Sequence, residues 1–166
     1  EEVTKSKVGA FVDKLVHNTA AIVTGAYRHV LDDVWAGRPA DPVWRDEVEK
    51  VSHRHYAAGF YYGPPGQYYE NARYIREWQV VALVTECAPD GTATLTLRNK
   101  FREGDTLEAV GPNLKPFAFQ AEAIEDGEGL PVTEPKTPRM VLRMKLPQQV
   151  PAWSILRIER DLSAKS

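Results

Sequence analysis

The sequence contains a single cysteine, Cys87, among 166 residues. One thiol can neither close a disulfide within the chain nor supply the several ligands of a cysteine-based metal site. This scarcity is typical of proteins in a reducing compartment, so we expect a cytoplasmic location. Because Cys87 falls within a strand-like pattern, we interpret it as a packed apolar side chain rather than a reactive thiol.

Long apolar runs and a strong net charge are also lacking. No stretch of roughly 18 apolar residues occurs, and the first residues do not have the basic-then-apolar order of a signal peptide, so we expect no contact with a membrane. The formal net charge is only -2. Charge over the whole chain therefore gives no general attraction to phosphates, and any contact with nucleic acid must come from a local cluster.

The first part of the sequence has the periodicity of helices. Apolar residues between Val8 and Val34 recur at steps of three and four, which predicts one long amphipathic helix. Gly37 followed by Pro39 predicts its end near Ala36, because glycine accepts a left-handed cap and proline cannot continue a helix.

A second, shorter helix is predicted directly afterwards. Asp41 is its expected N-cap, Pro42 lies in its first turn, and the helix is expected to end near Ser52. Its expected apolar face consists of Val43, Val48 and Val51.

The pattern changes to alternation from about residue 74 onward. Turn sequences such as Pro89-Asp90-Gly91 and Gly104-Asp105 separate six runs that we expect to be strands, near 78–87, 92–98, 105–110, 116–124, 139–146 and 153–160. We therefore predict an α+β fold, with an N-terminal helical segment followed by a small antiparallel six-stranded β-barrel, since closure removes two exposed edges. The expected division is 1–72 for the helices and an aromatic linker, and 73–166 for the barrel.

Two segments have residue types that suit RNA. The linker interleaves aromatic rings with basic side chains, which stack on unpaired bases and neutralise phosphates; its members are Tyr56, Phe60, Tyr61, Tyr62, Tyr68, Tyr69, Arg54, Arg73 and Arg76. The alternative is that these rings fill the seam between helices and barrel. The charged turn at 99–108 is either a solvated hairpin corner or a docking surface.

Signals for catalysis and metal binding are weak. The few serines lack the setting of a nucleophile elbow, and no acid, base and nucleophile converge in the sequence. His53 and His55 have the spacing of a metal pair but no third ligand nearby. We assign no catalytic residue and no metal site.

Several segments occur in the order found in one protein family: Glu2 with Thr4-Lys5-Ser6, Tyr27-Arg28 with Leu31-Asp32-Asp33, Ala36-Gly37-Arg38-Pro39, His53-Arg54 with Tyr56 and Gly59-Phe60, Gln67-Tyr68-Tyr69-Glu70-Asn71, and Asn99-Lys100-Phe101 with Gly104-Asp105 and Leu107-Glu108. Over nearly the whole chain the sequence resembles the C-terminal region of the collagenase-like peptidase family U32. Within that family it is most similar to the branch that forms 5-hydroxyuridine in tRNA.

The resemblance implies a fold and a role. The opening segment would be the end of a larger catalytic domain, and the later segment a small β-barrel similar to a translation-factor barrel domain. Full-length members would hold an iron–sulfur cluster on upstream cysteines, so we expect no cofactor in this chain.

We accordingly expect an accessory domain that helps to place a tRNA or protein substrate against its own upstream catalytic domain. The expected contact residues are Arg54, Tyr61, Arg73, Lys100 and Arg102. Whether the chain is itself an enzyme stays open. The alternatives are a self-contained peptidase and a protein-docking or structural barrel.

Overall fold

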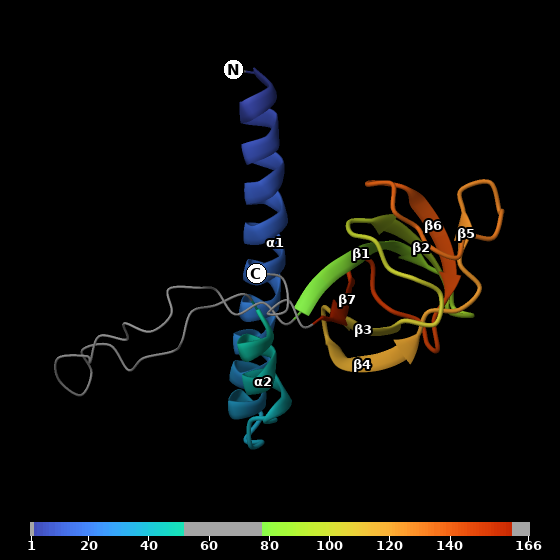
Figure 1. Cartoon of the computed structure of the whole chain (residues 1–166). Helices are drawn as coiled ribbons and strands as arrows, with labels where there is room; N and C mark the ends of the chain where they lie inside the picture. Colours follow the sequence, from blue (N-terminus) through green and yellow to red (C-terminus); the bar gives the residue numbers. More distant parts are fainter. Residues whose placement is uncertain (1, 52–77, 161–166) are drawn as a thin grey trace.

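The computed structural model of the protein describes residues 2–51 and 78–160, with side chains described from residue 19 onward. Two helices precede a single antiparallel sheet (Figure 1). The helix α1 (Glu2–Trp35) is a long rod, α2 (Val43–Lys50) lies beside its C-terminal part, and the curved sheet stands to one side. Within the described residues, no helix is both long and apolar enough to span a membrane.

The end of α1 agrees with the sequence prediction. The helix stops at Trp35, and Gly37 adopts a left-handed conformation with φ of 68°. The Gly37 amide donates to the Val34 carbonyl, and the Arg38 amide donates to the Asp33 carbonyl. These bonds satisfy carbonyl groups that have no partner inside the helix.

The start of α2 was predicted to within one residue, but of its predicted apolar face only Val51, directly after the helix, is buried. The N-cap position is occupied by Pro42 and not by Asp41 as predicted, but Asp41 Oδ1 still accepts a hydrogen bond of 3.1 Å from the amide of Val43, the first residue of α2. The buried residues of α2 are Trp44 and Glu47, whereas Val43 is half-buried. The helix is turned this way because Trp44 stacks on His29 of α1 and Glu47 joins an ionic network with the sheet.

The sheet contains seven strands in the order β4-β3-β7-β1-β2-β6-β5. Their bounds are β1 (Trp78–Cys87), β2 (Thr92–Leu97), β3 (Thr106–Gly111), β4 (Leu114–Gln120), β5 (Glu125–Asp126), β6 (Val141–Lys145) and β7 (Ile155–Glu159). Every neighbouring pair is antiparallel. The sequence prediction of α+β class is therefore correct.

The prediction of a closed six-stranded barrel was wrong. The strand β5 has two residues, too few to show an alternating pattern, and this is why it was missed. The sheet curls but is not closed by hydrogen bonds, since β4 and β5 are its two edges (Figure 1). Both edges have features that limit pairing without closure: β5 is very short, and β4 carries Pro116, which has no N–H group.

The core lies inside the curved sheet. Its central side chains are almost completely buried and come from every strand except β5; they include Val81, Val84, Leu95, Leu107, Phe119, Leu142, Met144 and Leu156. A second, smaller cluster joins α1 to the sheet through Ile22, Val51, Val110 and Ile155. This smaller cluster places the helices against β3 and β7, where the sites described below are found.

Candidate nucleic-acid interface

The loop between β2 and β3 is held rigidly at one corner of the sheet. The Arg98 and Asn99 amides both donate to the Val81 carbonyl, and the Phe101 side chain is only 1% exposed. Further on, the Arg102 amide donates to Asp105 Oδ2 over 2.8 Å, while the Asp105 amide donates to the Arg102 carbonyl. These bonds confirm the turn predicted at Gly104-Asp105 and fix the direction in which residues 100–102 project.

This corner gathers basic side chains around a pocket. Lys100, Arg102 and Arg160 line a hollow of about 350 Å³ together with Asp105 and Glu134. Arg160 Nη2 donates to the Lys100 carbonyl over 2.7 Å, which joins the end of β7 to the corner loop. With Lys136, whose charge also acts on Glu134, we call these four basic residues the basic corner.

One carboxylate neutralises part of the basic corner. Arg102 Nε donates to Glu134 Oε1 over 3.1 Å, with the Arg102 side chain 70% exposed. This hydrogen bond, and then the charges of Arg102, Lys100 and Lys136, hold the pKa of Glu134 below its ordinary value. Three cations and two carboxylates line the pocket, and Lys136 adds a positive charge close enough to act on Glu134, so the corner keeps a positive balance that suits phosphate groups.

Two of the five predicted contact residues, Lys100 and Arg102, lie together in this pocket. The other three, Arg54, Tyr61 and Arg73, lie outside the described residues, as do His53 and His55. Arg160 was not predicted as a contact, although its position directly after the last strand could have indicated an exposed basic side chain. The predicted residues stay predictions, because their binding role is a matter for experiment.

A buried ionic network connects α2 to the sheet. Arg157 Nη2 of β7 lies 2.7 Å from both carboxylate oxygens of Glu47 and 2.6 Å from Glu108 Oε1 of β3. Lys50 Nζ lies 3.0 Å from Glu47 Oε1 and 2.9 Å from Glu108 Oε1. Two cations thus balance two carboxylates, as burial of charge requires.

The indole of Trp78 covers this network. Lys50 Nζ and the Arg157 Cζ atom each lie 4.8 Å from the centre of the ring, within cation–π range. Among the described residues, Arg157 Nε and Nη1 have no hydrogen-bond partner, so on that side the face of the indole takes the place of water. Because both carboxylates already have cationic partners, the network is better suited to holding α2 in place than to proton transfer.

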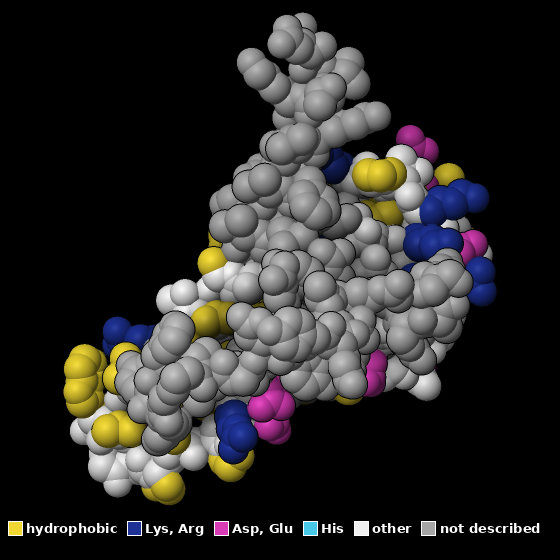
Figure 2. Space-filling model, turned by 60° about the vertical axis from the view of Figure 1, so that its left-hand side comes forward, with side chains coloured by type: hydrophobic (Ala, Val, Ile, Leu, Met, Phe, Trp, Pro, Cys, Tyr) yellow, Lys and Arg dark blue, Asp and Glu magenta, His cyan; other side chains and the backbone are white. Residues whose placement is uncertain are grey.

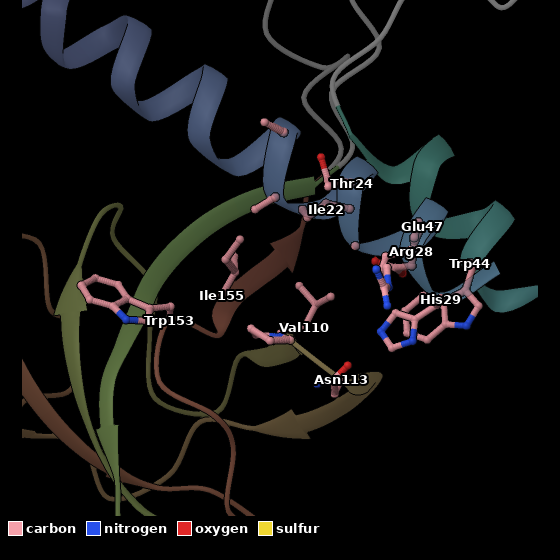
Figure 3. Close-up of a pocket in the computed structure, with 16 residues that line it drawn as sticks. Ile22, Thr24, Arg28, His29, Trp44, Glu47, Val110, Asn113, Trp153 and Ile155 are labelled. Atoms are coloured by element: carbon pink, nitrogen blue, oxygen red, sulfur yellow. The ribbon is translucent and has the colours of Figure 1, made fainter. Parts of the chain in front are cut away.

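A larger hollow lies between the helices and the sheet. This helix–sheet cavity has a volume of about 650 Å³ and is lined mainly by apolar and small residues. Figure 3 shows Ile22 and Thr24 of α1 above Val110 and Ile155, with Trp153 at one end and the His29–Trp44 pair at the other. The two rings of that pair are nearly parallel, at 2°, and their centres are 3.9 Å apart.

A second, smaller hollow adjoins the helix–sheet cavity. It has a volume of about 470 Å³ and shares His29, Trp44 and Asn113 with the larger one. Arg38 and Lys115 line it, paired with Asp33 and Asp41 respectively. The hydrogen bond with Asp41, and then its charge, raises the pKa of Lys115 above its ordinary value.

Exposed apolar side chains are concentrated on one face of α1. Tyr27, Leu31, Val34 and Trp35 are between 50% and 76% exposed and follow helical spacing. Figure 2 shows hydrophobic side chains at the lower end of the molecule, where α1 ends in Figure 1. Among the described residues, this exposed apolar patch with helical spacing lies on α1 and not on the sheet.

The described residues do not fit a metal or cluster site. Among them, no group of three His, Cys, Asp or Glu side chains is arranged to hold a metal ion. Cys87 is the only cysteine of the chain, and an iron–sulfur cluster needs several thiolates. Cys87 Sγ lies 3.6 Å from the Ala88 carbonyl oxygen, in the position of a packed thiol at the end of β1.

Two protein-family models match the chain. The model of peptidase family U32 matches residues 14–71, and the model of the peptidase family U32 C-terminal domain matches residues 76–157. Among solved structures, the chain is similar to the C-terminal domain of a Geobacillus thermoleovorans protein described as a U32 peptidase. Its selenomethionine variant is 29% identical over 48% of this chain and 98% of that one, with a TM-score of 0.46.

The curated relatives have names that refer to tRNA. The chain is 29% identical to tRNA hydroxylation protein P1 of Bacillus subtilis (strain 168) over 87% of its own length and 36% of that protein. It is 31% identical to tRNA hydroxylation protein P of Escherichia coli (strain K12) over 64% of its own length and 24% of that protein. The chain thus spans about a quarter to a third of the length of these relatives.

Proposed function

Because the chain belongs to peptidase family U32, we propose that it is an accessory part of a tRNA-hydroxylating enzyme and holds the tRNA at its basic corner. The hydroxylation chemistry would belong to a catalytic domain that these residues do not form. We keep the division of the chain into a helical part, 1–72, and a sheet domain, 73–166, within this proposal. It is supported by the two family models, which meet between residues 71 and 76.

The observation that carries the proposal is the convergence of Lys100, Arg102 and Arg160 on one pocket. Arg102 is well exposed and is held by Glu134 in a defined direction. A surface ion pair of this kind contributes little to stability, so its guanidinium can also contact a phosphate at small cost. The names of the curated relatives make tRNA the first RNA to test.

A peptidase reading has less support. The described residues near the corner contain no nucleophile paired with a base, and Asp105 accepts a hydrogen bond from a loop amide. Ser52, His53 and His55 lie outside the described residues. Peptide cleavage by the chain alone is therefore the less supported alternative to tRNA binding.

The test is binding of tRNA to the 166-residue chain, followed by fluorescence anisotropy between about 50 and 200 mM salt. We expect affinity to fall with salt, and we expect a Lys100→Ala/Arg102→Ala variant to bind more weakly. The slope of log K against log salt is negative, and each lost phosphate contact makes it shallower by about 0.7 to 0.9. The slope of the double variant should therefore be shallower by about 1.4 to 1.8.

The matched control is Arg45→Ala. Arg45 is 85% exposed on α2, lies outside the basic corner, and pairs only loosely with Glu49 at 3.8 Å. This variant removes one positive charge outside the basic corner and should bind tRNA like the wild type. If the wild type does not bind tRNA at any salt concentration, or the double variant binds equally well, the proposed function is wrong.

A further inference from the structure

We propose that the helix–sheet cavity receives one unpaired base of the bound RNA, with the Trp153 indole as its stacking surface. This inference rests on the proposed function, which supplies the RNA but assigns it only to the basic corner. The volume of about 650 Å³ is in the usual range of small-ligand sites. Its walls are mainly apolar, which suits the faces of an uncharged ring better than a phosphate.

Two residues with left-handed backbones line the cavity. Trp153 has φ of 70° and Asn113 has φ of 53°, and these are two of the four non-glycine residues with positive φ in the described part of the chain. Asparagine tolerates this conformation, but for a bulky residue such as tryptophan it is rare and costs free energy. Strain of this kind persists where surrounding bonds impose it and is concentrated at functional sites.

The strain at Trp153 holds its side chain outward. The Trp153 amide donates to the Val84 carbonyl over 2.8 Å, and Ser154 Oγ donates to the Pro151 carbonyl over 2.7 Å. These bonds fix the turn, yet the indole itself is 71% exposed. A large aromatic face is therefore kept in water at the mouth of an apolar cavity, as in proteins that stack unpaired bases.

The charges around the cavity favour a nucleotide over an apolar peptide. Arg28 lines the cavity, and Arg38 and Lys115 line the smaller hollow beside it. These three residues, which we call the rim cations, are each paired with an aspartate. Their side chains are between 62% and 71% exposed, whereas the aspartates are between 18% and 40% exposed. The outward-facing groups are thus mostly cationic. They gather at the His29–Trp44 end of the cavity, opposite Trp153, where they can meet phosphates farther along an RNA strand whose base stacks on Trp153.

Asn113 adds a means of contacting the base edge. It is exposed, lines both hollows, and its side-chain amide can donate and accept at the same time. An amide of this type pairs well with the edge of a base. The cavity thus combines a stacking ring, an apolar interior, an amide and flanking cations.

The experiment uses a short single-stranded oligoribonucleotide with 2-aminopurine at one position, whose fluorescence is quenched when the base stacks. A matched oligonucleotide that is abasic at the same position carries the same phosphates. We expect the abasic probe to bind at least about fivefold more weakly, since stacking one base on an aromatic ring contributes about 1 kcal/mol or more. Equal binding of the two probes would overturn the inference.

Variants of Trp153 locate the stacking surface. Trp153→Ala should reduce both quenching and affinity, and Trp153→Phe should restore most of each because it keeps a ring. The control is Tyr27→Ala, which removes an aromatic ring that is 62% exposed on α1 and does not line the cavity. If Trp153→Ala and Tyr27→Ala behave alike, Trp153 is not the stacking surface.

A second variant blocks the cavity from its helical wall. A Cβ atom at Gly25 would meet nothing within 4 Å, so Gly25→Leu places its side chain in open space. Leucine also favours the helix more than glycine does, and a thermal melt by circular dichroism should show that the fold is kept. We expect quenching of the probe to be lost, with affinity at least about fivefold lower, the value of one stacked base.

The outcomes separate this inference from the proposed function. If Lys100→Ala/Arg102→Ala weakens tRNA binding and Gly25→Leu leaves probe quenching unchanged, the base site is wrong and the basic corner stands. In a further outcome, the cavity binds free indole but not the base, and Gly25→Leu abolishes the binding of indole. The cavity would then receive another apolar group, and the inference would be wrong. Absence of all RNA binding overturns both.

Discussion

Arg157 on the last strand places one nitrogen, Nη2, 2.7 Å from each carboxylate oxygen of Glu47, a residue of α2 that lies 110 positions earlier in the chain. Both side chains are 1% exposed. A pair this deeply buried is expensive to break, because the remaining partner keeps a charge that water cannot reach.

We therefore expect Glu47→Ala to be strongly destabilising. Removal of one partner of a buried pair costs about 3 to 5 kcal/mol in the free energy of unfolding, and the lower end applies because Glu108 still faces Arg157. Urea denaturation of the 166-residue chain measures this. Glu49→Ala, on an exposed side chain of the same helix, should change stability by less than about 0.5 kcal/mol.

A double variant separates loss of charge balance from loss of packing. In Glu47→Leu/Arg157→Met both buried charges are gone, and the Lys50–Glu108 pair stays neutral on its own. We expect this variant to recover most of the stability that Glu47→Ala loses, since apolar replacements of both partners are often tolerated. A loss as large as that of the single variant would mean that the charges themselves stabilise the fold.

Trp78 offers a test of the ring above the network. Trp78→Phe keeps an aromatic face toward Lys50 and Arg157, whereas Trp78→Ala removes it. We expect the alanine variant to lose at least about 1 kcal/mol more than the phenylalanine variant, as cation–π contacts away from water contribute about 1 to 2 kcal/mol in addition to packing. Equal losses in urea denaturation would argue against the cation–π contacts.

The carboxyl group of Glu134 should titrate at lower pH than an ordinary glutamate. The hydrogen bond from Arg102 is the first cause of the lowered pKa, so Arg102→Ala should bring that pKa back up. A lowered pKa in the folded state means that the contribution of Glu134 to stability is present above its unfolded pKa and disappears as pH falls through the folded pKa. NMR titration of the Glu134 carboxyl group measures the shift, and Arg45→Ala should leave it unchanged.

Two glycines with left-handed backbones form a matched pair. Gly91 has φ of 88° and Gly104 has φ of 86°, but only at Gly91 would a Cβ atom overlap a neighbour, the Leu146 carbonyl. Gly104→Ala should cost the conformational strain alone, about 1 to 2 kcal/mol. Gly91→Ala should cost at least about 1 kcal/mol more, because the Leu146 backbone must move. Similar losses in thermal denaturation would contradict the clash.

Much of the fold was readable from local pattern. Alternation and turn residues placed six strands, and the turn at Pro89-Asp90-Gly91 forms as expected, with Asp90 Oδ1 accepting from the Thr92 amide. The two-residue β5 has no pattern of its own and depends on pairing with β6. The closed barrel failed as a prediction because closure would need the two edge strands to pair. Those strands, β4 and β5, follow each other in the chain but stand at opposite edges of the sheet, and alternation within a strand cannot report which strands pair.

The sites were harder to predict. Lys100 and Arg102 were recognisable because they stand beside a turn, where side chains are exposed. Glu47 and Arg157 look like ordinary surface charges in the sequence, since burial of a charge depends on a partner that only the fold supplies. Trp153 was passed over for a similar reason: its left-handed backbone is imposed by bonds to Val84 and Pro151, and has no signature of its own.

The ionic network also bears on how parts of such proteins can be exchanged. Helices and sheet look separable in the sequence, yet the guanidinium of Arg157 pairs with one carboxylate from α2 and one from β3. A chimera that joins these helices to the sheet of a relative keeps the buried charges balanced only if that sheet has a basic residue at position 157 to pair with Glu47. Positions 47 and 157 are therefore a pair that recombination must carry as one unit.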